Sequence, residues 1–136
     1  KCDDGLVAKK VVGKITQVSR EHHTTTVKGW ACNYSHSAGI KVKLYAYGKQ
    51  PGTTSPRDVY IPIGEMWSNQ SSNEEVAFHC GKFSTQGRAF SFSLSNADLS
   101  QFTNHRFYVK GISNTGGEDQ YIDGSGKHKV SLKLQR

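Results

Sequence analysis

The sequence predicts an all-β protein, a two-sheet antiparallel β-sandwich (Ig-like or jelly-roll-like) of about seven strands with one short helix. Short runs of alternating apolar and polar residues recur along the chain, and no long stretch has the period of an α-helix. The 14 Gly residues indicate frequent turns. With 136 residues, 35% of them hydrophobic, the chain fits one domain. We expect an N-terminal arm at residues 1–10 and a single sandwich domain at residues 11–136.

The first half of the chain alternates predicted strands with polar turns. A run of Thr suits the second strand, because β-branched side chains fit a pleated surface. Pro62 cannot donate a hydrogen bond to a neighbouring strand, so its strand is expected to be bulged or at a sheet edge. The strands are predicted at residues 11–18, 24–32, 40–48 and 58–66, and a turn at residues 19–23.

The strand at residues 24–32 contains a conflict between its two faces. Val27 and Ala31 share one side by strand parity, but Trp30 and Cys32, on the other side, also favour burial. A bulge near Gly29 would resolve the conflict. We expect Trp30 to lie in the core.

The second half of the chain contains the predicted helix and the remaining strands. Ser72 and Glu75 form a capping-box pattern, which predicts a short helix at residues 72–79. Strict alternation in the segment AFSFSL predicts a strand with its Phe side chains inward. The later elements are expected as strands at residues 89–94, 105–113 and 127–134, a turn or single helical turn at 96–102, and a Gly-rich acidic loop at 114–126.

Three cysteines leave one without a partner if two of them pair. Cys32 and Cys80 each end an apolar stretch and precede a turn, so we expect a disulfide between them. On the chain-entropy model it would stabilise the fold by about 4 kcal/mol. Cys2 lies in a polar terminal segment, and it is left either free, bonded to another domain, or bonded to one of the other two.

An ordered series of short motifs resembles a β-sandwich module that recurs in secreted bacterial proteins, often appended to hydrolases or adhesins. The motifs are GWACN, LYAYG, EEVAFHC, RAFSFSL, NHRFYVKGI and IDGSG. The resemblance implies an accessory role in binding glycans or surfaces, with two cysteines bridged. This chain departs from the module in its basic charge and in Asn33, where an Asp is common.

A formal net charge of +7 favours anionic partners such as acidic polysaccharides, nucleic acids or phospholipid surfaces. The basic residues are spread along the whole chain, with no dense cluster or nucleic-acid motif, so we do not expect nucleic acid. The alternative is that the charge only aids solubility. No apolar run approaches the roughly 18 residues of a membrane span, and the chain opens on a charged segment rather than a signal peptide. We therefore expect a mature secreted protein or an excised module.

The outward faces of the predicted strands carry the first candidate binding site. By strand parity, cations alternate there with aromatic rings, a pattern that could hold an acidic polysaccharide by charge and stacking. The alternative is a solvated sheet face with tyrosines packed across strands. The candidate ligand-binding residues are Lys41, Lys43, Tyr45, Tyr47, Arg106, Tyr108 and Lys110, with Lys129 and Lys133 beside them.

A second candidate site lies at the loop end of the predicted sandwich. It combines amide side chains, which bind sugar hydroxyls, with an aromatic platform in Trp67. Its candidate ligand-binding residues are Asn33, Tyr34, His36, Trp67 and Asn69.

We expect no catalytic residues, no cofactor and no metal ion. The six histidines form no recognisable catalytic pattern, and no GxSxG nucleophile motif is present. The acids of the Gly-rich loop match no EF-hand spacing, and the cysteines have no zinc-ligand spacing.

The sequence therefore predicts a secreted, non-enzymatic module at the cell surface or in the periplasm, with carbohydrate or an acidic polymer as its partner. A disulfide agrees with such an oxidising location. The alternative is a protein-interaction or structural accessory domain of a larger secreted protein or enzyme. It would dock to a protein partner or a further domain through a sheet edge or Cys2. A small hydrolase ranks third.

Overall fold

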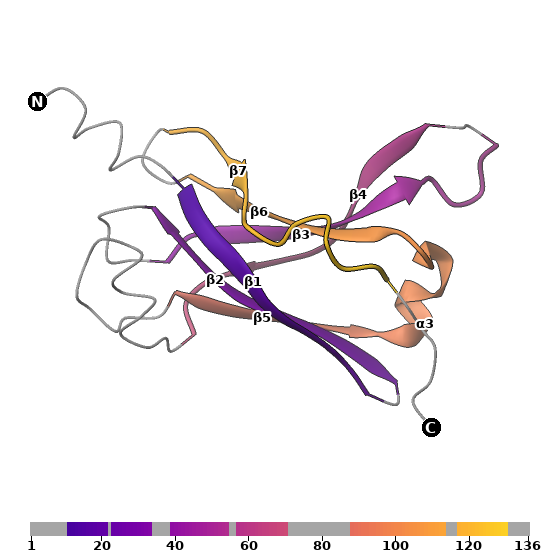
Figure 1. The fold of residues 1–136 in the computed structure, drawn as a ribbon, viewed down its shortest axis with the longest axis horizontal. Coiled ribbons are helices and arrows are strands. Elements are labelled where there is room, and N and C mark those ends of the chain that lie inside the picture. The colour runs from indigo at the N-terminus through magenta and orange to yellow at the C-terminus, as the bar shows by residue number, and fades with distance from the viewer. Residues whose placement is uncertain are drawn as a thin grey trace, which may run out of the picture.

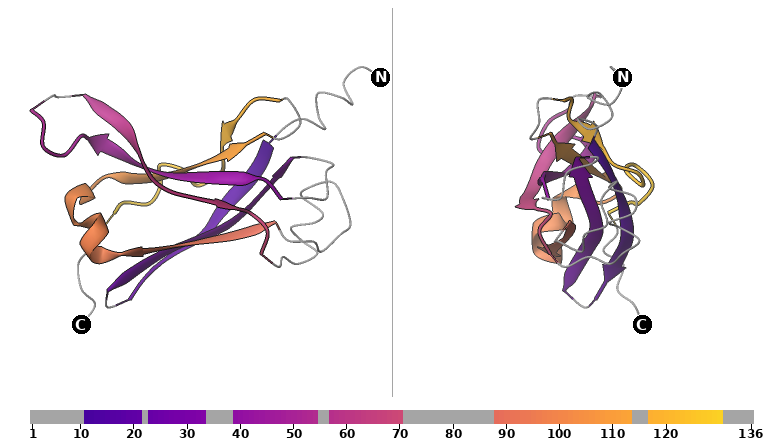
Figure 2. Two further views of the ribbon diagram at one scale, coloured as in Figure 1. Left: turned by 180° about the vertical axis from the view of Figure 1, so that it is seen from behind. Right: turned by 90° about the vertical axis from the view of Figure 1, so that its left-hand side faces the viewer.

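The chain forms two antiparallel sheets that pack face to face as two layers (Figures 1 and 2). The structure is a computed structural model that describes residues 11–21, 23–33, 39–54, 57–70, 88–113 and 117–130. One sheet has the strand order β1-β2-β5 and the other β4-β3-β6-β7. The first contains β1 (Val11–Arg20), β2 (Thr24–Asn33) and β5 (Ala89–Ser95); the second contains β4 (Asp58–Trp67), β3 (Lys41–Lys49), β6 (Arg106–Ile112) and β7 (Gln120–Tyr121).

The predicted two-sheet sandwich is confirmed. The expected strands at 11–18, 24–32, 40–48, 58–66, 89–94 and 105–113 are all present, with ends that differ by at most two residues. The single helical turn at 96–102 is the short helix α3 (Asn96–Leu99) followed by the 3-10 turn η1 (Ser100–Phe102). The predicted helix at 72–79 and the arm at 1–10 lie outside the described residues, and the single-domain assignment stays a prediction.

One prediction for the C-terminal part was wrong, and a second is only partly described. The segment at 114–126, expected to be a loop, contains β7 and the buried Ile122. Of the strand predicted at residues 127–134, the described residues 127–130 form only an isolated antiparallel bridge, between Lys129 and Arg106, and residues 131–134 lie outside the described residues. Strand β7 has too few residues to show an alternating pattern that the sequence could reveal. Its pairing with β6 identifies it as a strand.

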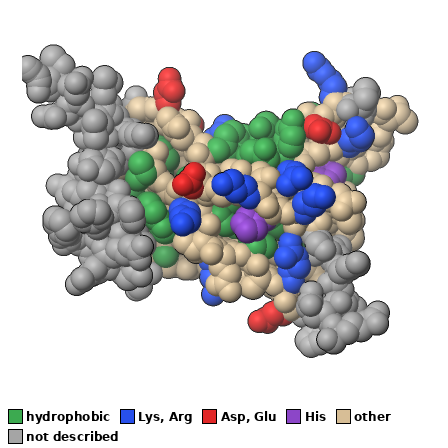
Figure 3. Space-filling view, in the orientation of Figure 1, with side chains coloured by type: hydrophobic (Ala, Val, Ile, Leu, Met, Phe, Trp, Pro, Cys, Tyr) green, Lys and Arg blue, Asp and Glu red, His purple; other side chains and the backbone are tan. Residues whose placement is uncertain are grey.

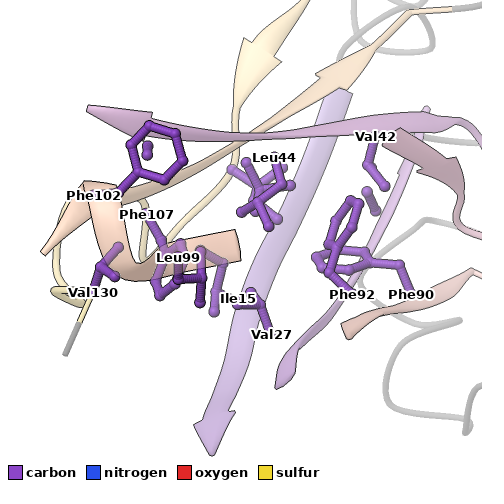
Figure 4. Close-up of a cluster of buried hydrophobic side chains, with 14 of the residues drawn as sticks. Ile15, Val27, Val42, Leu44, Phe90, Phe92, Leu99, Phe102, Phe107 and Val130 are labelled. Atoms are coloured by element: carbon purple, nitrogen blue, oxygen red, sulfur yellow. The ribbon is translucent and has the colours of Figure 1, made fainter. Parts of the chain in front are cut away.

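The core lies between the two sheets and is built from one face of the longer strands (Figure 4). On β3, Val42, Leu44 and Ala46 are fully buried, as the alternation of that strand predicts. Leu99 of α3 and Phe102 of η1 are also buried in it. The other buried side chains of this cluster include Ile15, Val27, Phe90, Phe92, Phe107, Val109 and Val130.

Trp30 does not lie in this core, so its expected position was wrong. Strand β2 keeps its regular alternation, and the irregularity in pairing lies in β1, between Ile15 and Gln17. Trp30 and Cys32 are therefore on the opposite face of β2 from Val27. There they form a second small cluster with Val12, in which only Cys32 is buried.

The prediction for Pro62 is confirmed in both respects. Strand β4 is at the edge of its sheet, and its pairing with β3 shifts between Leu44 and Tyr45, opposite Gly64 and Pro62. The extra residue changes the parity of β4. As a result, Trp67 is exposed on the same face of the sheet as Tyr60.

Candidate functional site

The outer face of the β4-β3-β6-β7 sheet carries a cluster of tyrosines, which we call the tyrosine face. The alternate residues of β3 and β6 fill the core, so their neighbours along each strand face away from it. Tyr60 of β4 and Tyr121 of β7 join them at the two edges of the sheet. The tyrosine face consists of Tyr45, Tyr47, Tyr60, Tyr108 and Tyr121.

The rings of the tyrosine face form one continuous layer. The ring centroids of Tyr47 and Tyr60 are 4.4 Å apart, and those of Tyr60 and Tyr108 are 5.1 Å apart with the rings edge to face at 88°. Tyr60 and Tyr121 come from opposite edges of the sheet, yet their rings stack at 5.2 Å and 22°. The edge side chains therefore reach across the central strands, as cross-strand packing allows for long aromatic residues.

The exposed large hydrophobic side chains of the described residues all lie on this sheet. They are Tyr60, Trp67 and Tyr121, which are 43%, 51% and 36% exposed. Figure 3 shows hydrophobic side chains gathered above β3 and β6, between β7 and the β3–β4 hairpin. A contiguous exposed apolar patch on a small protein is typical of an interaction site.

Lysine ammonium groups lie against these rings. The Nζ atom of Lys110 is 5.1 Å from the ring centroid of Tyr121 and 5.8 Å from that of Tyr45. Lys41 Nζ is 5.8 Å from the centroid of Trp67 and 3.1 Å from Glu65 Oε2. A cation over an aromatic face gains electrostatic energy from the ring quadrupole. The face therefore presents rings and positive charges side by side.

The packing of the rings raises the pKa of two of them. Partial removal from water, followed by the charges of Tyr60, Tyr45 and Tyr108, raises the pKa of Tyr121 to about 12. The same two causes, with Tyr108 and Tyr47 as the neighbours, raise the pKa of Tyr60. Tyr121 and Tyr60 thus resist ionisation because they are partly removed from water and because the neighbouring rings would repel their negative charge.

We predict that alkaline pH loosens the fold through the tyrosine face. The pKa of a tyrosine in an unfolded chain is about 10, so between about pH 10 and 12 the folded state holds the Tyr121 proton more tightly than the unfolded state. Stability is then lost as pH rises through this window. Urea unfolding across it should show the fall, and Tyr121→Phe should reduce it. A Tyr121→Phe variant with an unchanged pH profile would contradict the prediction.

A hollow of about 670 Å³ adjoins the tyrosine face at the end of β3. His105 helps to shape it, because its Nε2 donates a hydrogen bond to the Lys49 carbonyl oxygen at 2.8 Å. This bond ties the residue before β6 to the last residue of β3. The residues lining the hollow include Tyr47, Lys49, Asp58, His105, Arg106 and Tyr108.

The structure gathers most of the predicted site residues on one surface. One face of the sheet carries Lys41, Lys43, Tyr45, Tyr47, Trp67, Arg106, Tyr108 and Lys110. Trp67, which we assigned to the loop end, belongs to this face because of the bulge in β4. Asn69 follows β4 and is exposed. The ligand-binding role of all these residues stays a prediction.

The second predicted site is only partly described. Asn33 is fully buried, and its role as a ligand contact stays a prediction. Tyr34 and His36 lie outside the described residues. Two members of the tyrosine face were missed: the parity of β4 could have identified Tyr60, whereas no local pattern marks Tyr121.

Cys32 is fully buried and disulfide-bonded. Both Cys2 and Cys80 lie outside the described residues, so the pairing with Cys80 stays a prediction. No group of three or more His, Cys, Asp or Glu side chains in the described ranges is placed to hold a metal ion.

The fold and site define a β-sandwich domain with an aromatic and cationic sheet face. No family model and no curated protein matches the chain. Two solved structures resemble it, a β-glucosidase from Kluyveromyces marxianus and the same enzyme in complex with glucose, with TM-scores of 0.45 and 0.43. Both are 8% identical and cover 85% of this chain, which spans 14% of theirs. This similarity is too weak to carry a functional argument, and the resemblance to the bacterial module stays a prediction.

Proposed function

We propose that the protein is a non-catalytic module that binds carbohydrate or an anionic surface polymer through the tyrosine face and Trp67. The observation that carries the proposal is that Tyr60, Trp67 and Tyr121, the exposed large hydrophobic side chains of the described part, share one sheet face with lysine ammonium groups. We further propose that it acts outside the cytoplasm, where a disulfide at Cys32 persists.

The chemistry of the face suits a sugar. One side of a pyranose ring presents C–H groups, which pack against an aromatic ring, while its hydroxyls need donors and acceptors. Each tyrosine supplies an apolar ring for the C–H groups and a hydroxyl that donates and accepts hydrogen bonds with the sugar hydroxyls. The sheet holds several such rings in fixed positions, so little conformational freedom is lost on binding.

The alternative function is a protein-interaction or structural accessory domain. The observation that favours it is the edge strand β4, because an unpaired edge can add a strand from a partner. Pro62 and the bulge interrupt this edge, and both features discourage strand addition. The edge of β4 therefore supports this function less than the aromatic face supports the first.

Retention on immobilised polysaccharides tests the proposal. We expect the protein to be retarded on at least one of a panel of neutral and acidic polysaccharides, and Tyr60→Ala or Trp67→Ala to weaken the retardation about tenfold. Stacking on an aromatic side chain is typically worth ~1–3 kcal/mol, and a tenfold change in affinity corresponds to about 1.4 kcal/mol. Lys28→Ala, which alters an exposed residue of the other sheet, is the matched control.

Two outcomes would contradict the proposed site. Equal retention of Tyr60→Ala, Trp67→Ala and Lys28→Ala would place binding elsewhere. The absence of binding to every polysaccharide, with co-purification of a single protein, would favour the protein-interaction domain.

A further inference from the structure

The tyrosine face continues into the hollow at the Lys49 end of β3. Tyr47 and Tyr108 belong to both surfaces. Trp67 pairs with Lys41 at the other end of β3. The path from Lys41 to Lys49 is eight residue steps, or about 26 Å at roughly 3.3 Å each. Such a length accommodates several linked sugar units rather than one.

Arg106 connects the hollow to a further group of cations. Its Nη1 donates to the Gly126 carbonyl oxygen at 3.1 Å, and its backbone bridges to Lys129. Arg20 Nη2 in turn donates to the Lys129 carbonyl oxygen at 2.5 Å. We name this group the basic band, and it consists of Arg20, Arg106, Lys127 and Lys129. Figure 3 shows Lys and Arg side chains over the segment that follows β7.

The charges along this path are unevenly balanced. Lys43 is directly opposite Lys110 on β6, a placement in which like charges destabilise a sheet, and directly opposite Glu65 on β4 at its other side. The described carboxylates on the path are Glu65, which pairs with Lys41, and Asp58 at the hollow. Neither Lys110 nor Arg106 forms an ion pair with a described carboxylate. An anionic ligand would relieve the repulsion between the two lysines and meet Arg106 in the hollow.

From these observations we infer that the ligand is a linear acidic polysaccharide. It lies along β3, with sugar rings on the tyrosine face and an acidic group bound by Arg106 in the hollow. This inference rests on the proposed function and adds the charge, length and direction of the ligand. Arg106 suits the acidic group because a guanidinium has five N–H donors, of which the bond to Gly126 uses one.

Matched pairs of polysaccharides test the charge of the ligand. The panel contains uronate and sulfated polysaccharides, each beside its carboxyl-reduced or desulfated form. We expect retention of at least one acidic member that weakens with added salt and is lost in its neutral form. Fragments of that polymer should bind more tightly with increasing length until they span the path. Equal retention of the neutral forms overturns the inference but leaves the proposed function standing; no retention of any member overturns both.

Charge variants test the position of the acidic group. Arg106→Gln should weaken retention about tenfold. Lys28→Gln removes the same charge from the other sheet and should leave retention unchanged. Lys127→Gln removes a charge from the basic band at an exposed side chain, where the substitution should not disturb the fold. It should weaken retention, but less than Arg106→Gln does. Asp58→Asn should strengthen retention a few-fold, since it removes a repelling carboxylate. Equal effects of Arg106→Gln and Lys28→Gln, or weaker retention in Asp58→Asn, would overturn the inference.

Discussion

Phe107→Ala is expected to lower the free energy of unfolding by about 3–5 kcal/mol. This is a large share of the ~5–15 kcal/mol that stabilises a typical domain. Phe107 is fully buried on β6 and is one of the core side chains in Figure 4. Its removal leaves a cavity that two packed sheets cannot readily close. Urea unfolding followed by circular dichroism measures the loss.

The next residue along β6 is the control for this prediction. Tyr108 faces away from the core, and its ring contacts Tyr47, Tyr60 and Tyr121. Tyr108→Ala should therefore cost less stability than Phe107→Ala while weakening polysaccharide retention. Equal losses of stability in the two variants would contradict the placement of Phe107 in the core.

Gly29→Ala is expected to destabilise the fold by about 1–3 kcal/mol or more, the range for overpacked cores. A Cβ atom at this position of β2 would lie 2.2 Å from the Lys14 carbonyl oxygen and 2.7 Å from Cζ of Phe90. A ring can shift by a rotation, but the Lys14 oxygen belongs to the backbone of the paired strand. The substitution must therefore separate β1 from β2, and thermal unfolding should report it.

Gly64→Ala provides the graded comparison. Its Cβ would lie 3.1 Å and 3.3 Å from two ring carbons of Phe92, contacts that a small movement of that side chain relieves. We expect a clearly smaller loss of stability than for Gly29→Ala. If Gly29→Ala and Gly64→Ala are equally stable, a glycine at position 29 is not required for the close approach of β1 to β2.

The face that carries the candidate site could be predicted in part from local alternation. Lys43, Tyr45 and Tyr47 face outward because every second residue of β3 fills the core, which is a property of the strand itself. Trp67 could not be placed in this way, because one extra residue in β4 reverses the parity after the bulge. Tyr121 could not be placed either, since its strand has only two residues.

The prediction for Trp30 shows a second limit of local patterns. Its size favours the core, and Gly29 beside it predicts a bulge in β2. Instead, Gly29 makes room for the ring of Phe90 and the backbone of β1, and the bulge lies in the neighbouring strand. Residue size and glycine content do not reveal which strand is irregular, because a bulge is a property of a pair of strands.

The sequence by itself determined the class of the fold, most of its strands, and the alternation of lysine and tyrosine along β3. These features are local, because successive side chains of a strand point to opposite faces. Only the tertiary structure decided that Tyr60 and Tyr121 meet from opposite edges of the sheet, and that Arg106 joins the hollow to the basic band. Such contacts depend on the order in which distant segments pair, and no short stretch of sequence contains that order.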